Sequence, residues 1–161
     1  MEIIVTKPGD ITKEELVKVH DLVLSGGQVS RVGLMERIIE CRYLGLCYLD
    51  DKLIAVSAIK QPSESKTKRI LEKAKIKNTI VPKLELGYCV TKNEFGKQGI
   101  NKNINDQLLD KLENGEKIYS TTNNDTIRKY LSSNGFLKVG ESYEGKKNIL
   151  LDYFERSDIQ K

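Results

Sequence analysis

The feature that most restricts the fold is a strand-like run that leads through a polar, glycine-containing loop into an amphipathic helix. Residues 83–90 are rich in apolar and aromatic side chains, which predicts a strand. Apolar residues then recur every four positions over 99–113, which predicts a helix, and residues 118–122 predict another short strand. The stretch therefore predicts a strand–helix–strand unit. If its strands are parallel, the crossover is right-handed and the helix covers the sheet.

Further elements are expected on both sides of this unit. Thr12 and Glu15 have the spacing of a capping box, and Asn124 is expected to cap a later helix. The other expected helices lie at about 13–25, 32–41, 65–75 and 125–134. The other expected strands lie at 2–6, 43–49, 53–59, 136–139 and 148–154. The strands at 43–49 and 53–59 are joined by a short acidic turn, which predicts an antiparallel hairpin.

Composition places the chain among the globular proteins. It has 161 residues, of which 39% are hydrophobic and 31% charged, and this suits a single domain spanning 1–161 with a core of its own. No segment approaches the roughly 20 apolar residues of a membrane helix. The first residues lack the pattern of a secretion signal, so we expect a cytoplasmic protein.

The cysteine and histidine counts argue against several kinds of site. Cys41, Cys47 and Cys89 form no C-x-x-C pair, and we expect free thiols in a reducing compartment. His20 is the only histidine, so a Ser-His-Asp triad would depend on that one residue. We expect no metal site, because too few ligands stand at usable spacing.

A basic segment lies at 62–82. It contains six lysines and arginines, all between Lys66 and Lys77, and only two acidic residues. It is expected to form a helix whose basic side chains are solvated, or alternatively a docking surface for an anionic partner. The net charge of +4 is too small by itself to indicate a nucleic-acid ligand.

The loop before the helix at 99–113 has the properties of an anion site. Residues 94–102 are polar and contain Gly96 and Gly99, flanked by Lys97 and Lys102. The first turn of a helix has N–H groups without partners, and glycine lets a phosphate approach the backbone closely. The sequence contains neither the P-loop motif nor G-x-G-x-x-G, so these two kinds of nucleotide site are excluded.

The order of the elements and this loop resemble the GNAT superfamily of acyl-CoA-dependent N-acetyltransferases, and in particular a bacterial and phage branch of it. Family members carry a Q/R-x-x-G-x-G/A loop, which residues 96–101 match at Gly99 but not at Gly96 or Asn101. The pair Gly135-Phe136, preceded by Asn124, resembles a second family motif. The resemblance implies an α/β (α+β) fold: a mixed, mostly antiparallel sheet of six to seven strands, a central parallel β-α-β unit and helices on both faces.

The resemblance also implies an activity and a cofactor. The activity is direct transfer of an acetyl group from acetyl-CoA (coenzyme A) to an amine. The residues implied to bind the cofactor are Cys89, Val90, Gly96, Lys97, Gln98, Gly99, Ile100, Asn101, Lys102 and Asn124. A backbone N–H near Cys89 or Val90 would polarise the thioester carbonyl.

Glu85 is implied as the base, because it lies four residues before Cys89, as in some family members. A structural or substrate-orienting role for this carboxylate is the alternative. In a regular strand Glu85 and Cys89 share one face and Tyr88 and Val90 the other, unless a bulge intervenes. Cys89 is expected to be a small, buried residue and not a nucleophile.

The thiolate acid is the clearest departure from the family. Leu131 occupies the position of the tyrosine that often protonates the leaving thiolate. Ser132, Tyr143 or water is the expected substitute. The departures at Leu131, Gly96 and Asn101 leave a non-catalytic CoA-binding sensor or structural module as an alternative function.

The expected partners are acetyl-CoA and an unidentified amine acceptor. A basic nucleic-acid-binding module centred on Lys66 to Lys77 is a weaker alternative, because the tyrosines are not interleaved with that run. No membrane partner is expected, and the sequence is compatible with a homodimer.

Overall fold

The structure is a computed structural model that describes residues 1–77 and 79–157. Its residues group into two compact units: Met1–Gln61 with Leu86–Leu112, and Pro62–Glu85 with Glu113–Lys161. Position 78 of the basic segment and positions 158–161 of the expected domain lie outside the described residues. The single-domain organisation stays a prediction.

The described chain forms one mixed sheet with the strand order β1-β2-β3-β4-β5-β8-β6, and β7 pairs with β8. The strands are β1 (Glu2–Thr6), β2 (Tyr43–Leu49), β3 (Lys52–Lys60), β4 (Leu84–Thr91), β5 (Ile118–Thr122), β6 (Leu137–Lys138), β7 (Tyr143–Glu144) and β8 (Leu150–Arg156). The helices are α1 (Lys13–Ser25), α2 (Leu34–Ile39), α3 (Glu64–Lys73), α4 (Ile100–Leu109) and α5 (Asp125–Ser133). Three short 3-10 turns lie at Pro8–Asp10, Asn93–Phe95 and Lys146–Asn148.

The expected fold class is confirmed. Strands β4 and β5 are parallel, and the pairs β1–β2, β2–β3, β5–β8 and β6–β8 are antiparallel. The described residues form eight strands where six or seven were expected. The additional strand is β7, which is two residues long and therefore too short to show an alternating pattern in the sequence.

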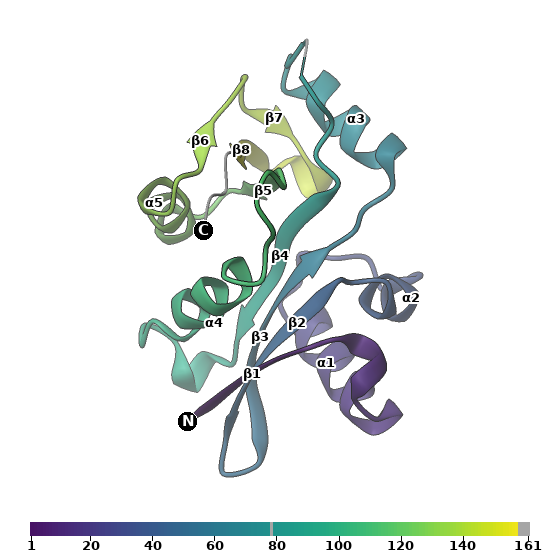
Figure 1. Cartoon of the computed structure of the whole chain (residues 1–161), viewed down its shortest axis with the longest axis vertical. Helices are drawn as coiled ribbons and strands as arrows, with labels where there is room; N and C mark the ends of the chain where they lie inside the picture. Colours follow the sequence, from purple (N-terminus) through teal and green to yellow (C-terminus); the bar gives the residue numbers. More distant parts are fainter. Residues whose placement is uncertain (78, 158–161) are drawn as a thin grey trace. The chain divides into compact units, whose positions relative to one another are not determined.

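Helices cover both faces of the sheet in the first unit (Figure 1). Leu44 and Leu46 of β2 belong to an apolar cluster with residues of α1 and α2. Gly45, between them, points the other way, and a Cβ there would collide with Ile104 and lie 3.2 Å from Leu108, both in α4. The β2–β3 hairpin forms as expected, with Asp50 and Asp51 both at positive φ, as a type I′ turn requires.

Helix ends follow the polar residues and glycines of the sequence. Thr12 caps α1 by accepting a hydrogen bond from the Glu15 N–H at 3.1 Å. Helices α2 and α4 are shorter than the expected 32–41 and 99–113. Each begins after a glycine in left-handed conformation, Gly33 or Gly99, and each ends a few residues earlier than expected. The last strand begins at Leu150, two residues later than expected, because the preceding residues form a 3-10 turn.

The second unit has an apolar cluster of its own beneath α3. Leu71 of α3 and Ala74, the residue after α3, pack against Tyr119 of β5 and Tyr153 of β8, whose rings stack at a centroid distance of 5.4 Å. Helix α3 corresponds to the expected basic helix, although it spans Glu64–Lys73 and not 65–75.

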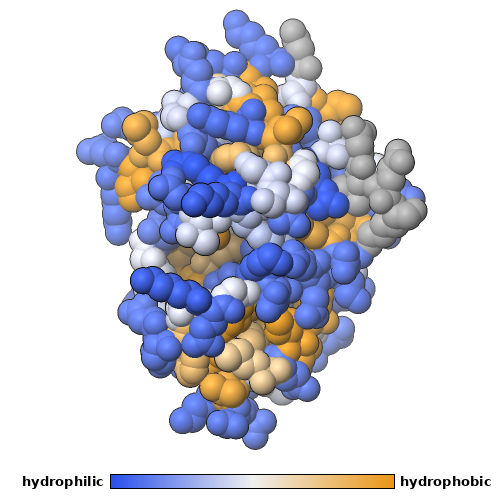
Figure 2. Space-filling view, turned by 90° about the vertical axis from the view of Figure 1, so that its left-hand side faces the viewer, coloured by the Kyte–Doolittle hydropathy of each residue, from blue (hydrophilic) through white to orange (hydrophobic). Residues whose placement is uncertain are grey.

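The surface and the cysteines agree with the composition. Hydrophilic side chains cover most of the face shown in Figure 2, and apolar side chains form separate patches between them. In the described part of the chain, no helix has the length and hydropathy needed to cross a bilayer. Within the described residues, Cys41, Cys47 and Cys89 form no disulfide, as expected.

The packing at Gly45 predicts a large effect of a single methyl group. Gly45→Ala should lower the free energy of unfolding by about 1–3 kcal/mol, because the added Cβ overlaps Ile104 of α4. Urea denaturation followed by circular dichroism measures this change. Gly9→Ala is the matched control, because a Cβ at Gly9 has no neighbour within 4 Å. Equal stability of the two variants would contradict the close packing of α4 on β2.

Candidate functional site

Strand β4 is irregular at the point where the cofactor was expected to lie. Tyr88 has a φ of 55°, which is strained for a bulky residue within a strand. Its ring is buried in the cluster with α1 and α2, and Lys60 Nζ lies 4.2 Å from the ring centroid. Cys89 points to the α4 side, with its Sγ 3.8 Å from the Asn105 side chain. The left-handed residue breaks the alternation, so a face shared by Glu85 and Cys89 does not follow from strand periodicity.

Cys89 is also less buried than expected. It is half-buried, while Tyr88 beside it is 8% exposed. Cys89 follows directly on the left-handed residue, where the backbone is no longer regularly extended. Apolar composition alone could not show this.

The loop between β4 and α4 leaves a row of backbone N–H groups without partners. The N–H of Gly96 donates to Asn93 O at 3.1 Å, and the N–H of Asn103 donates to Gly99 O at 3.1 Å. Between them, no acceptor in the described chain takes an N–H of residues 97–102. We call residues 97–102 the amide loop. Because these N–H groups stand at the positive end of α4, the loop suits an anion.

Two left-handed residues shape the amide loop. Gly99 has a φ of 71°, and Lys97 reaches 62° although it carries a side chain. A Cβ added at Gly99 would meet no atom within 4 Å, so the space in front of the helix is open. The Lys97 side chain is exposed, whereas Lys102 Nζ is paired with Asp106 at 3.1 Å. Lys97 is therefore the more available of the two expected cations.

Asn101 differs from the small residue of the GNAT motif because its side chain ties α4 to the sheet. Its Nδ2 donates to Val56 O at 2.9 Å and to Ser57 Oγ at 3.0 Å, both in β3. Its Oδ1 accepts a hydrogen bond from Thr91 at the end of β4. The side chain therefore binds within the protein, and its backbone N–H remains available in the amide loop.

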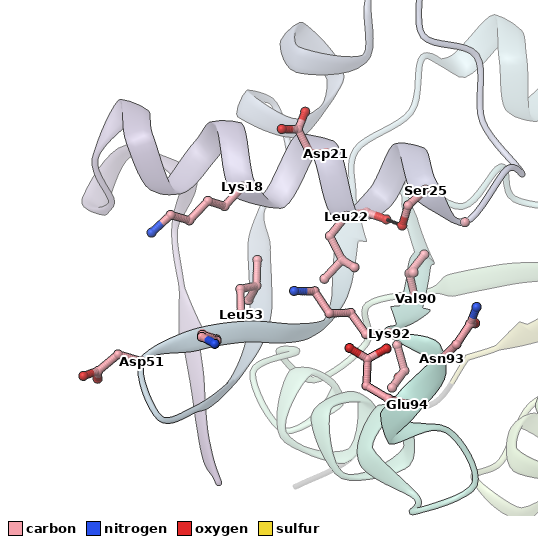
Figure 3. A pocket seen from close by; sticks show the side chains of 13 residues that line it. Lys18, Asp21, Leu22, Ser25, Asp51, Leu53, Val90, Lys92, Asn93 and Glu94 are labelled. Atoms are coloured by element: carbon pink, nitrogen blue, oxygen red, sulfur yellow. Dashed lines mark hydrogen bonds between the residues drawn. The ribbon is translucent and has the colours of Figure 1, made fainter.

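A pocket of about 730 Å³ adjoins the segment that leads into the amide loop (Figure 3). Helix α1 contributes Leu22 and the hairpin contributes Leu53, and both form an apolar part with Val90. Lys92 extends into the pocket, and Glu94 lies next to it. The remaining lining residues are Lys18, Asp21, Ser25, Gly26, Asp51, Lys52, Thr91 and Asn93. An apolar wall with charges of both signs suits a ligand with an apolar body and polar ends.

Glu85 lies in the second unit, within a buried polar cluster. It is 6% exposed, and its Oε1 lies 3.6 Å from Lys66 Nζ of α3. Tyr119 pairs with Glu85 in the register of β4 and β5, and its hydroxyl lies 3.2 Å from Thr67 Oγ1. Burial, and next the negative charge of Glu85, raise the pKa of Tyr119 far above its ordinary value, so the phenol keeps its proton.

Tyr143 belongs to the same cluster. Burial raises the pKa of Tyr143 to about 12; a hydrogen bond with Thr121 opposes this, and the charge of Glu85 adds to it. The structure therefore brings two of the three expected catalytic residues, Glu85 and Tyr143, into one electrostatic environment. Ser132 is exposed on α5, and no contact of its side chain connects it to this cluster among the described residues.

Leu131 and Asn124 have clear structural roles in the second unit. Leu131 is fully buried, and its carbonyl accepts the N–H of Phe136 at 3.0 Å, which ends α5 at the Gly135-Phe136 motif. Asn124 caps α5, as expected, by accepting the Ile127 N–H at 3.0 Å. Its Oδ1 is thus used within the protein. A cofactor role for Asn124 stays a prediction.

Lys66, Thr67 and Tyr119 were not predicted as neighbours of Glu85. One signal was present: Thr67, Leu71 and Ala74 have the spacing of one helix face, so Thr67 belongs on the buried side with Lys66 at its edge. The role of the Asn101 side chain had no comparable signal, because its partners lie on strands far away in the sequence.

The contacts of Asn101 predict its contribution to stability. Asn101→Ala should lower the free energy of unfolding by about 1–3 kcal/mol, because Val56 O and Thr91 would lose their partner. Asn103→Ala, an exposed position on the same helix, is the control and should change stability by less than about 0.5 kcal/mol. Urea denaturation distinguishes the two. A neutral Asn101→Ala would show that the side chain does not hold α4.

Comparison with known proteins gives matches in structure only. No protein-family model matches the sequence, and the search of curated proteins found no match. ElaA of Escherichia coli is 13% identical with a TM-score of 0.73, covering 98% of this chain and 100% of that chain. A GNAT-family acetyltransferase from Streptococcus agalactiae is 14% identical with a TM-score of 0.70, covering 98% of this chain and 96% of that chain.

A third solved structure contains a ligand. Arabidopsis thaliana Naa50, in complex with the bisubstrate analogue CoA-Ac-MVNAL, is 14% identical with a TM-score of 0.67, covering 98% of this chain and 99% of that chain. At these identities the likeness is one of fold. The chain has the fold of the GNAT acetyltransferases.

Proposed function

We propose that the chain is an acetyl-CoA-dependent N-acetyltransferase that transfers an acetyl group directly to an amine. The observation that carries this proposal is the row of N–H groups in the amide loop, which have no acceptor in the described chain and stand at the start of α4. The amide loop also resembles the GNAT motif that holds the cofactor, which supports the same assignment. A diphosphate carries negative charge and several acceptor oxygens, so it can accept hydrogen bonds from these N–H groups.

The proposed cofactor site is built on this loop. The N–H groups of residues 97–102 and the Lys97 side chain would hold the diphosphate. Cys89 and Val90, which follow the left-handed Tyr88, would contact the pantetheine arm. A backbone N–H near Cys89 or Val90 would polarise the thioester carbonyl. The N–H of Gly96 already donates to Asn93 O, so it is not offered to the diphosphate. Gly96 would contribute by having no side chain that blocks the diphosphate. A cofactor contact of Asn124 remains part of the proposal.

The proposed chemistry uses two residues of the buried cluster. Acetyl-CoA supplies an acetyl group activated as a thioester. Glu85 would take a proton from the amine as its nitrogen bonds to the acetyl carbon and the carbon–sulfur bond breaks. Tyr143 would supply a proton to the departing thiolate, because its phenol is protonated at neutral pH; the raised pKa also makes this phenol a weaker acid than an exposed tyrosine. Ser132 is the alternative donor.

A non-catalytic CoA-binding module is the second candidate, and one observation favours it. Leu131, at the position where the family often has its acid, is fully buried and packed. The basic segment does not favour nucleic-acid binding, because three of its lysines, Lys66, Lys68 and Lys75, each lie within 4.0 Å of a carboxylate oxygen. The acceptor amine, a homodimer and a cytoplasmic location remain parts of the proposal.

Thiol release from acetyl-CoA tests the catalytic proposal. The panel should contain a peptide with a free α-amine, a lysine-containing peptide with a blocked α-amine, and spermidine. Release that depends on one of these amines supports the enzyme. CoA binding without release from any of them would favour the non-catalytic module, and no CoA binding would reject both.

A substitution at Gly99 tests the amide loop. Gly99→Asp should weaken CoA binding by at least about tenfold in calorimetry, because a carboxylate would stand where the diphosphate is proposed to bind. Gly115→Asp is the matched control, because Gly115 also has a positive φ, of 83°, and open space at its Cβ position. Equal loss of affinity in both variants would attribute the effect to folding. Unchanged affinity in Gly99→Asp would contradict the assignment of the loop.

A further inference from the structure

Lys66 places a positive charge against the carboxylate proposed as the base. Its Nζ lies 3.6 Å from Glu85 Oε1, and the Glu85 side chain is only 8% exposed, against 39% for Lys66. A carboxylate buried to this degree favours the protonated form, and a protonated carboxyl cannot accept a proton from an amine. An ammonium at this distance acts in the opposite direction by stabilising the charged form.

The position of Lys66 is fixed by its neighbours in the helix. The Lys66 N–H donates to Ser63 Oγ at 3.2 Å, so Lys66 lies in the capped first turn of α3. Thr67, the next residue, is fully buried and is hydrogen-bonded to Tyr119, which pairs with Glu85 in the register of β4 and β5. The helix is therefore tied to β5 next to Glu85, and the Lys66 side chain reaches the carboxylate from the edge of the buried face.

Other lysines of the basic segment have different surroundings. Lys68 Nζ lies 3.3 Å from Glu64, with both side chains more than half exposed. Lys75 pairs with Glu141 at 3.1 Å, again at the surface. Exposed pairs of this kind contribute little to stability, so these lysines offer controls of equal charge.

Two phenols of the second unit also act on Glu85. Tyr119 of β5 and Tyr143 of β7 both interact electrostatically with Glu85. Both phenols keep their protons at neutral pH, so they act as dipoles and not as charges. Lys66 is therefore the group in this set whose removal changes the net charge at Glu85.

We infer that Lys66 is a positioning residue that holds Glu85 in its ionised form and so sets the lower pH limit of the acetyl transfer. The inference rests on the proposed function. Lys66 takes no part in the bonds that form and break, and the amine proton still goes to Glu85. Part of the basic segment thus serves the reaction by acting on the base.

The test compares Lys66→Met, Lys66→Arg and Lys68→Met with the unmodified chain. Two quantities are measured: the pH dependence of thiol release with the best amine of the panel, and the titration midpoint of the Glu85 carboxyl carbon by NMR. The signal of Glu85 is identified by its absence in Glu85→Gln, which should also lose transfer by about 10²–10⁴-fold. Because the amine is the same throughout, its own ionisation cancels between variants.

The expected result is a matched shift in both quantities. Lys66→Met should raise the Glu85 midpoint and the acidic limb of the rate profile by about one to three pH units. The rate at high pH and the CoA affinity should stay the same. Lys66→Arg should restore the original profile, and Lys68→Met should not change it.

Each contrary result has a separate meaning. An unchanged Glu85 midpoint in Lys66→Met, with the fold intact by circular dichroism, overturns the inference. A midpoint that moves while the rate profile does not overturns the role of Lys66 in the reaction. Absence of transfer in the unmodified chain rejects the proposed enzyme and this role with it, whereas the NMR midpoint still decides whether Lys66 holds the charge of Glu85.

Discussion

The packing of α4 against the sheet fixes the part of the molecule on which the proposed chemistry depends. Gly45 leaves no side chain between β2 and α4, and Asn101 ties the first turn of the helix to β3 and β4. A helix held in this way must begin just after β4, where its first N–H groups have no acceptor in the described chain. Backbone groups of this kind are rarely left without a partner unless water or a ligand supplies one.

The need for free backbone N–H groups explains why the loop can depart from the GNAT motif at Gly96 and Asn101. The motif needs N–H groups and space, and neither depends on a particular side chain. Asn101 turns its side chain toward β3, so its larger size does not fill the space in front of the loop. Lys97 adopts a left-handed conformation, which is strained for a residue with a side chain, and it places an exposed cation in the loop.

Local patterns made most of the fold predictable from the sequence. The strand–helix–strand unit, the hairpin and the caps at Thr12 and Asn124 each depend on residues close together in the chain, and all are present. The left-handed conformation of Tyr88 and the Lys66–Glu85 pair could not be predicted, because tertiary contacts determine them. Of the candidate site, the loop was therefore predictable, whereas the surroundings of Glu85 were not.

The most direct test of the account is a ¹⁵N-resolved NMR titration of the protein with CoA. The amide signals of residues 97–102 should shift together and saturably, and more strongly than those of residues 13–15 at the start of α1, which has its own side-chain cap. Saturable shifts confined to other parts of the chain, with the signals of residues 97–102 unchanged, would contradict the account.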